Sequence, residues 1–171
     1  MKTTGSTDCI FNLLRSLRYE YTPTEVVDRL REFPQQEVLP YLRELTLTHN
    51  NDAISARAID AILQIDREFG RSMLLELWVR PDWEWFFCYA AIEFGDDAFV
   101  VPLCQILQNS HDPTTRYMAA IALERKGNLT AVESLTHALD DPGEDYEGRK
   151  ISEKAESALI AIHTRAGNSE N

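Results

Sequence analysis

The stretch GDDAFVVPLCQILQNSHDPTTRYMAAIALERKG, residues 95–127, decides the fold of this chain, because other segments read as imperfect copies of it. Apolar residues at helical spacing precede and follow a polar break at 109–113. The stretch therefore predicts two helices joined by a short turn. One such hairpin cannot bury its apolar face alone, so copies must stack against one another.

Two glycines close the second helix of successive copies in this interpretation. Gly95 and Gly127 each follow the last apolar residue of a helical pattern. A glycine at that place commonly takes a left-handed backbone conformation. We therefore expect both glycines to have positive φ angles, and a β-branched side chain at Gly127 to destabilise the fold by steric cost at positive φ.

Matching residues at fixed spacings indicate internal repetition. Pro81 lies 32 positions before Pro113, the same spacing that separates the two glycines. The segment Val-Leu-Pro at 38–40 stands 62 positions before Val-Val-Pro at 100–102, as two copies of a 31-residue unit would place it. Chance would rarely produce both spacings.

The repeat pattern predicts an all-α fold, because no segment alternates apolar and polar residues as a strand would. We expect an α-α superhelix, or solenoid, of about five helical hairpins over residues 8–165. The polar ends at 1–7 and 166–171 are expected to be flexible tails.

The pattern DxxxVxPLxxxLxxxxDPxxRxxAAxALxxxG at 96–127 resembles the HEAT-like repeat first described in phycobilisome lyases. The likeness is strongest there, extends over 128–163, and weakens through 36–95 toward the N-terminus. It implies a two-helix solenoid repeat and specifies no single function, since such repeats occur in lyase subunits, adaptors and enzymes.

The resemblance also suggests what some side chains do. Arg116 stands where this repeat often has an arginine that links to a neighbouring aspartate, whereas the preceding copy has Glu84 at that position. In a bilin lyase subunit, a tetrapyrrole would lie along Trp85, Tyr89 and Tyr117, with Arg116 available for a propionate.

Composition narrows the range of partners. The chain has 171 residues, 44% of them apolar and 26% charged, with a formal net charge of −11. This charge would repel a phosphate backbone, so it argues against nucleic-acid binding and favours a protein partner with a basic surface.

The sequence favours a cytoplasmic protein. Its N-terminal residues contain no apolar run long enough for a signal or membrane segment. The three cysteines form no Cys-x-x-Cys pair and lie in apolar helical stretches, which predicts reduced, buried thiols.

The most unusual segment is the aromatic cluster at 83–89, with Trp78 just before it. We expect one helical face, made of residues 83, 86, 87, 90 and 94, to be core. Trp85 and Tyr89 lie off that face and are expected to be exposed together, and Trp85 aligns with Tyr117 of the next copy. Such an aromatic ladder would suit an interface, and an oversized core remains the alternative.

An acidic loop follows at 140–148. It carries Asp140, Asp141, Glu144, Asp145 and Glu147, and its spacing lacks the alternating oxygen ligands of a calcium loop. Two interpretations stay open, a docking site for a basic surface and a solvated turn.

Catalytic and metal chemistry find no support in the sequence. His137 and Asp141 are four residues apart and could meet across a helix end, but such a pair caps a helix far more often than it binds a metal. No residues resemble a nucleophile with its base, and we expect no cofactor.

Two functions of different classes follow from these observations. The first is a non-catalytic scaffold or adaptor that binds a basic partner on its concave face, through Trp85, Tyr89, Arg116 and Tyr117 or through the acidic loop. The second is the auxiliary lyase or phycobilisome-handling subunit that the resemblance implies.

Overall fold

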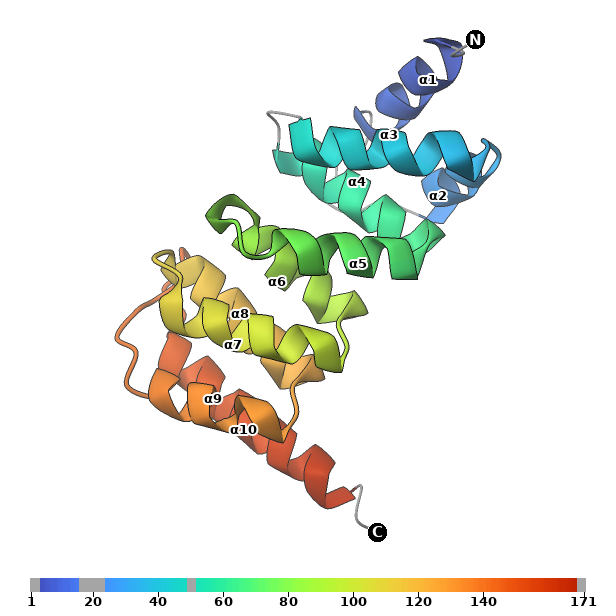
Figure 1. Cartoon of the computed structure of the whole chain (residues 1–171). Coiled ribbons are helices and arrows are strands. Elements are labelled where there is room, and N and C mark those ends of the chain that lie inside the picture. Colours follow the sequence, from blue (N-terminus) through green and yellow to red (C-terminus); the bar gives the residue numbers. More distant parts are fainter. Residues whose placement is uncertain (1–3, 16–23, 49–51, 169–171) are drawn as a thin grey trace. The chain divides into compact units, whose positions relative to one another are not determined.

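A computed structural model describes residues 4–15, 24–48 and 52–168, all of them in helices or in the connections between helices (Figure 1). Those ranges contain no strand, and Glu144 and Lys150 form an isolated β-bridge. The all-α class predicted from the sequence is therefore confirmed. The packing of the helices is compatible with a helical repeat.

The chain divides into two compact units, residues 1–73 and 74–171. The boundary falls inside the range 8–165 that was predicted as one repeat domain. Within the described ranges, no helix has the length and apolar character needed to cross a membrane.

The first unit is built around α4. Its helices are α1 (Thr4–Arg15), α2 (Thr24–Arg31), α3 (Gln35–Thr48), α4 (Asp52–Ile65) and the start of α5 (Arg67–Leu77). α3 packs along α4, and α1 and α2 also contact it. Every residue of α4 from 54 to 63 is buried, including Arg57, whose guanidinium donates to the Leu14 carbonyl at 2.9 Å.

The ends of the helical region differ from the predicted tails. α1 begins at Thr4 and α10 continues to Asn168. Adding residues to an existing helix costs little, which accounts for the longer α1. The last turn of α10 is also held by Arg165, which donates to the Gly127 carbonyl at 2.9 Å. The rest of the predicted tails, residues 1–3 and 169–171, lies outside the described residues.

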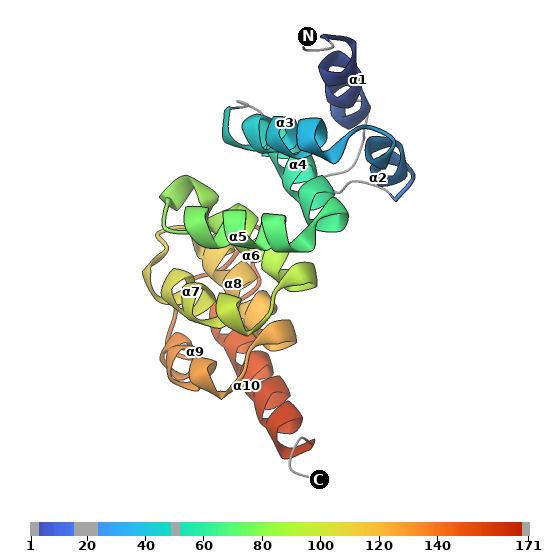
Figure 2. The ribbon, with the colours of Figure 1, turned by 45° about the vertical axis from the view of Figure 1, so that its right-hand side comes forward.

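The second unit has two layers of helices. Its elements after α5 are the 3₁₀ turn η1 (Pro81–Trp83), α6 (Glu84–Phe94), α7 (Asp97–Asn109), α8 (Pro113–Lys126), η2 (Leu129–Ala131), α9 (Val132–Ala138) and α10 (Ile151–Asn168). α8 packs against both α6 and α10, whereas α7 packs against α9 (Figures 1 and 2). Each of α7 and α9 also packs on the helix that follows it, as the predicted hairpins require.

Small residues let α8 approach its neighbours closely, and large ones fill the space beside α6. The alanines of α8 at 119, 120 and 122 are fully buried. In α6 the ring of Phe87 stacks on Phe99 of α7 at 4.8 Å and lies 6.3 Å from Trp78. The predicted core face at 83, 86, 87 and 90 is confirmed as buried, and Phe94 is half-buried.

Side-chain caps fix where the helices of the second unit begin. Asp96 accepts from the Ala98 amide, Asp112 from the amides of Thr114 and Thr115, and Asn128 from the Thr130 amide. Arg80 occupies the position equivalent to Asp112 and provides no side-chain cap. The helix that follows Arg80 starts with a 3₁₀ turn, as does the one that follows the capping Asn128.

Gly95 and Gly127 do not have the left-handed conformation predicted for them. Their φ angles are −61° and −67°, with extended ψ angles, and in the described ranges only Gly148 has a positive φ, at 79°. The chain instead leaves each helix directly into extended backbone. The glycine amide still donates to the carbonyl four residues earlier, at 3.0 Å for Gly95 and 2.7 Å for Gly127.

Close approach, rather than positive φ, explains why glycine is needed there. A Cβ added at Gly127 would lie 2.5 Å from the Leu123 carbonyl oxygen and 3.0 Å from Ile162 Cδ1. A Cβ at Gly95 would meet the Ala91 carbonyl oxygen at the same 2.5 Å. The backbone cannot yield to such a contact without disturbing the helix end.

We expect Gly127→Ala to lower the free energy of unfolding by about 1–3 kcal/mol, because a methyl group is forced against a backbone carbonyl. The control is Gly167→Ala in α10, where a Cβ meets nothing within 4 Å. That change is expected to leave stability unchanged or to raise it slightly. Urea unfolding of both variants checks the prediction, and equal stabilities would contradict it.

Candidate functional site

The connections α5–α6, α7–α8 and α9–α10 lie along one edge of the second unit, on the left in Figure 1. This edge contains the acidic loop, Arg116 and the start of the aromatic segment. Most of the side chains that the sequence singled out therefore gather near it.

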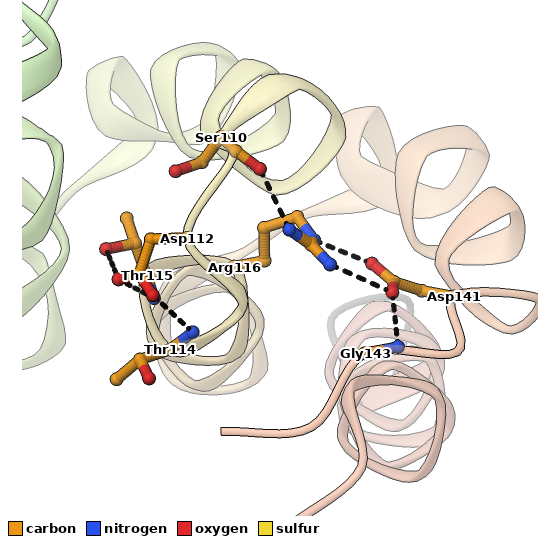
Figure 3. A network of polar contacts seen from close by, with 7 residues as sticks. All are labelled: Ser110, Asp112, Thr114, Thr115, Arg116, Asp141 and Gly143. Carbon is orange, nitrogen blue, oxygen red and sulfur yellow. Dashed lines mark hydrogen bonds and ion pairs between the residues drawn. The ribbon is translucent and has the colours of Figure 1, made fainter. Parts of the chain in front are cut away.

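Arg116 joins α8 to the residues around it through three donors (Figure 3). Its Nε lies 2.8 Å from Asp141 Oδ2, its Nη2 lies 3.1 Å from Asp141 Oδ1, and its Nη1 donates to the Ser110 carbonyl at 2.9 Å. The side chains of Arg116 and Asp141 are only 17% and 15% exposed. This arrangement, called here the Arg116 network, confirms that Arg116 links to a neighbouring aspartate.

The local sequence fixes both partners of this ion pair. The Asp112 cap and Pro113 start α8, which places Arg116 in the first turn of that helix. Asp141 follows α9 and also accepts the Gly143 amide at 2.8 Å. A Cβ at Gly143 would lie 2.6 Å from Arg116 Nη2, so a larger residue there would require the guanidinium to shift.

A second network orders the acidic loop from within. The Asp145 side chain is fully buried, although its residue type usually faces water. Its Oδ1 accepts the amides of Glu147 and Arg149, and its Oδ2 accepts Arg149 Nε at 2.7 Å. Internal hydrogen bonds therefore hold the loop in a defined turn. Because its side chain is buried in these bonds, Asp145 is not available to a partner.

The two networks keep both aspartates ionised. The hydrogen bonds from Arg116 lower the pKa of Asp141 below its ordinary value, although burial works in the opposite direction. Burial would raise the pKa of Asp145, but the Arg149 guanidinium and the loop amides together lower it. In each case the hydrogen bonds together outweigh the effect of burial.

The predicted aromatic surface does not form as one exposed patch. Trp85 and Tyr89 stack on each other, with ring centroids 5.5 Å apart and planes 8° apart, and both are half-buried. Tyr117 is buried, because the guanidinium of Arg149 covers its ring at 4.8 Å. The predicted row of exposed rings from Trp85 to Tyr117 is therefore absent, because Arg149 of the α9–α10 loop covers Tyr117.

Two grooves open along the same edge, and they share Asn109. The larger, of about 540 Å³, lies between the ends of α7 and α9 and is lined by Leu107, Gln108, Asn109, Ser134, His137, Ala138, Asp140 and Asp141. The smaller, of about 300 Å³, is lined by Trp78, Val79, Glu84, Gln105, Ile106 and Asn109. We call them the α9 groove and the α6 groove.

Carboxylates and exposed apolar side chains border these grooves. The carboxylates of Asp140 in the α9 groove and Glu84 in the α6 groove make no hydrogen bond or ion pair with the described residues. Exposed apolar side chains stand nearby in the connections: Val79 is 66% exposed, Leu139 39% and Tyr146 78%. The edge combines uncompensated negative charge with apolar contact area.

Sequence reasoning missed part of this site. Asn109 was treated only as a turn residue, yet it belongs to both grooves. The 32-residue spacing could have drawn attention to Asn109, because it aligns this residue with Asp141 of the next repeat. His137 lines the α9 groove, but Asp141 binds Arg116 rather than meeting this histidine.

A third groove, of about 560 Å³, lies at the other end of α8 and is basic. Its cations are used to hold helix ends together: Lys126 donates to the Glu93 carbonyl at 3.1 Å, and Arg165 donates to the Glu124 carbonyl at 2.6 Å. Arg125 pairs with the Glu93 carboxylate at 2.6 Å. These contacts explain the cations as helix caps.

The described residues contain no group of three or more histidine, cysteine or acidic side chains placed to hold a metal ion. Burial raises the pKa of the Cys88 and Cys104 thiols, the opposite of what a nucleophilic thiolate requires.

Comparison with known proteins adds no family assignment. No protein-family model and no curated protein matches the chain. The likeness to HEAT-like repeats therefore rests on the sequence pattern alone.

We expect Asp141→Asn to lower the free energy of unfolding at neutral pH by about 2–3 kcal/mol, because it leaves the poorly exposed Arg116 guanidinium without its counter-charge. A matched change, Glu93→Gln, removes a carboxylate whose pair with Arg125 is well exposed, and should cost less than about 1 kcal/mol. Chemical unfolding of both variants checks the difference.

The same ion pair predicts an acid dependence. Because folding lowers the pKa of Asp141, its stabilisation is complete above the unfolded pKa of about 3.9 and is lost as the pH falls through the folded value. The stability difference between the wild type and Asp141→Asn should therefore shrink below about pH 4. A difference that stays constant down to the acid transition would contradict this assignment.

Proposed function

We propose that this protein is a non-catalytic protein-interaction module that binds a basic, extended segment of a partner protein across the α9 and α6 grooves. One observation carries the proposal. The two grooves meet at Asn109, and each contains a carboxylate, Asp140 or Glu84, without a cationic partner among the described residues.

Charge complementarity favours a basic occupant. The acidic loop adds Glu144 to the same edge, and the chain as a whole carries a net charge of −11. Such a field attracts cationic segments and speeds their association, while individual charges at the site determine where they bind. The loop aspartates bound by Arg116 and Arg149 contribute less, because their charge is already compensated.

Apolar side chains give the segment something to pack on. Tyr146, Leu139 and Val79 are exposed in the connections that border the grooves. Interfaces gain most of their energy from such anchors, with charged groups around them setting orientation and specificity. A basic segment that also carries apolar residues fits this edge best.

This site differs from the surface expected from the sequence. The concave face of a solenoid was predicted to bind the partner through Trp85, Tyr89, Arg116 and Tyr117. Tyr117 is covered and Arg116 is engaged with Asp141, so a tetrapyrrole on these residues would need both contacts to open. The proposal therefore uses the grooves and does not include a chromophore.

The experiment is chemical-shift mapping of the ¹⁵N-labelled protein with a synthetic peptide in which arginine and lysine alternate with glycine. We expect saturable shifts of the amides of Asn109, Ser134 and Asp140. Shifts spread evenly over the acidic surface, or none that saturate, would overturn the proposal.

We expect Asp140→Asn to weaken binding of this peptide by about three- to fivefold, because it removes the uncompensated charge of the α9 groove. The matched control, Glu156→Gln, makes the same charge change at an exposed carboxylate of α10 that lines neither groove. It should alter the affinity less than about twofold. Fluorescence anisotropy measures both, and equal effects would indicate attraction to net charge alone.

A further inference from the structure

Two successive repeats of the second unit place different chemistry at equivalent positions. The spacing of 32 residues relates Pro81 to Pro113, and it also relates the ends of α5 and α7 at Leu77 and Asn109. The register therefore holds across the edge where the grooves lie, and each member of the Arg116 network has a counterpart one repeat earlier.

The equivalent residues of the earlier repeat include no arginine or lysine in the place of Arg116. Glu84 stands in place of Arg116, Asn109 in place of Asp141, and Trp78 in place of Ser110. All three line the α6 groove, whereas the Arg116 network joins its own two segments directly. Where the later repeat has a guanidinium between three acceptors, the earlier repeat has an opening of about 300 Å³.

Two of the side chains around this opening, Glu84 and Asn109, present hydrogen-bond acceptors. Glu84 presents a carboxylate that makes no hydrogen bond or ion pair with the described residues. The Asn109 amide nitrogen donates to the Gln105 carbonyl at 2.9 Å, which leaves its Oδ1 as an acceptor. An occupant that contacts both Glu84 and Asn109 Oδ1 would therefore be a donor, and a positive charge would compensate Glu84.

Arg80, four residues before Glu84 in the sequence, does not fill the position. Arg80 precedes η1, and its Nη2 pairs with Asp82 at 2.9 Å, at the exposed side of the connection. Cys88, one turn beyond Glu84, is fully buried, and its raised thiol pKa keeps it neutral. Among the described residues lining the groove, Glu84 is the sole charged group.

We propose that the α6 groove is an arginine subsite, in which a partner's guanidinium takes the place that Arg116 has in the next repeat. This inference rests on the proposed function and assigns one side chain of the basic segment. The Glu84 carboxylate and Asn109 Oδ1 accept its N–H groups, and its apolar stem lies against Trp78 and Val79.

Arginine suits the subsite better than lysine. The guanidinium is a planar fork that donates in several directions at once, as Arg116 does toward Asp141 and Ser110. An ammonium is a compact, strongly hydrated charge that would lose more water on entering beside Trp78. The subsite should therefore distinguish the two cations.

The test compares arginine-only and lysine-only versions of the glycine-spaced peptide on the full chain. We expect the arginine peptide to bind at least about fivefold more tightly and to shift the indole N–H signal of Trp78. Glu84→Gln should reduce this affinity about tenfold, as expected for loss of a charge-assisted hydrogen bond, and should remove the preference for arginine.

A double variant, Glu84→Arg with Asn109→Asp, rebuilds the Arg116 network inside the chain. It should fold with unchanged or higher thermal stability and lose the Trp78 shift, because an internal guanidinium occupies the subsite. This variant keeps the test valid if Glu84→Gln merely weakens the start of α6, where an acidic side chain favours the helix.

The outcomes separate the two proposals. If the peptides shift Ser134 and Asp140 but neither Glu84 variant changes their affinity, the arginine subsite is wrong, and the proposed binding of a basic segment stands for the α9 groove alone. Equal affinities for arginine and lysine peptides also overturn the subsite. If neither peptide binds saturably, both proposals fail.

Discussion

The edge of the second unit depends on the ion pair between Arg116 and Asp141. Its two oxygens and two nitrogens meet at 2.8 and 3.1 Å, while the third donor holds the Ser110 carbonyl. One side chain thereby fixes the end of α7, the start of α8 and the path of the chain after α9. Because the pair is mostly shielded from water, each partner would be costly to leave alone. Asp141, held by this pair, forms part of the wall of the α9 groove.

The same edge shows how a repeat can keep its helices while changing its chemistry. Pro81 and Pro113 both start a helical segment, yet one is preceded by Arg80 and the other by the capping Asp112. The earlier repeat has Glu84 at the position of Arg116, so it lacks the internal ion pair and has the α6 groove in its place. Helix packing survives because it depends on buried residues such as Phe87 and Ala120 rather than on this position.

Sequence periodicity was sufficient to predict the helices and the buried face at 83, 86, 87 and 90, whereas the aspartate partner of Arg116 was implied by the resemblance to the HEAT-like repeat. It failed at Gly95 and Gly127, because a glycine after a helix fits both a left-handed cap and a close backbone approach. It also failed at Tyr117, which only the fold of the α9–α10 loop brings under Arg149. Contacts between distant segments leave no local pattern, so the grooves could not be foreseen.

The cations at the C-terminal end of α8 affect how the second unit unfolds. Arg165 of α10 holds the last carbonyls of α8, and Lys126 of α8 holds the Glu93 carbonyl at the end of α6. The ends of α8 and α6 are thus each capped by a side chain from the helix packed beside them, α10 for α8 and α8 for α6. Detachment of α10 would uncap α8, and fraying of α8 would uncap α6. Disruption that begins at the C-terminus should therefore spread inward, coupling the three helices into one cooperative element.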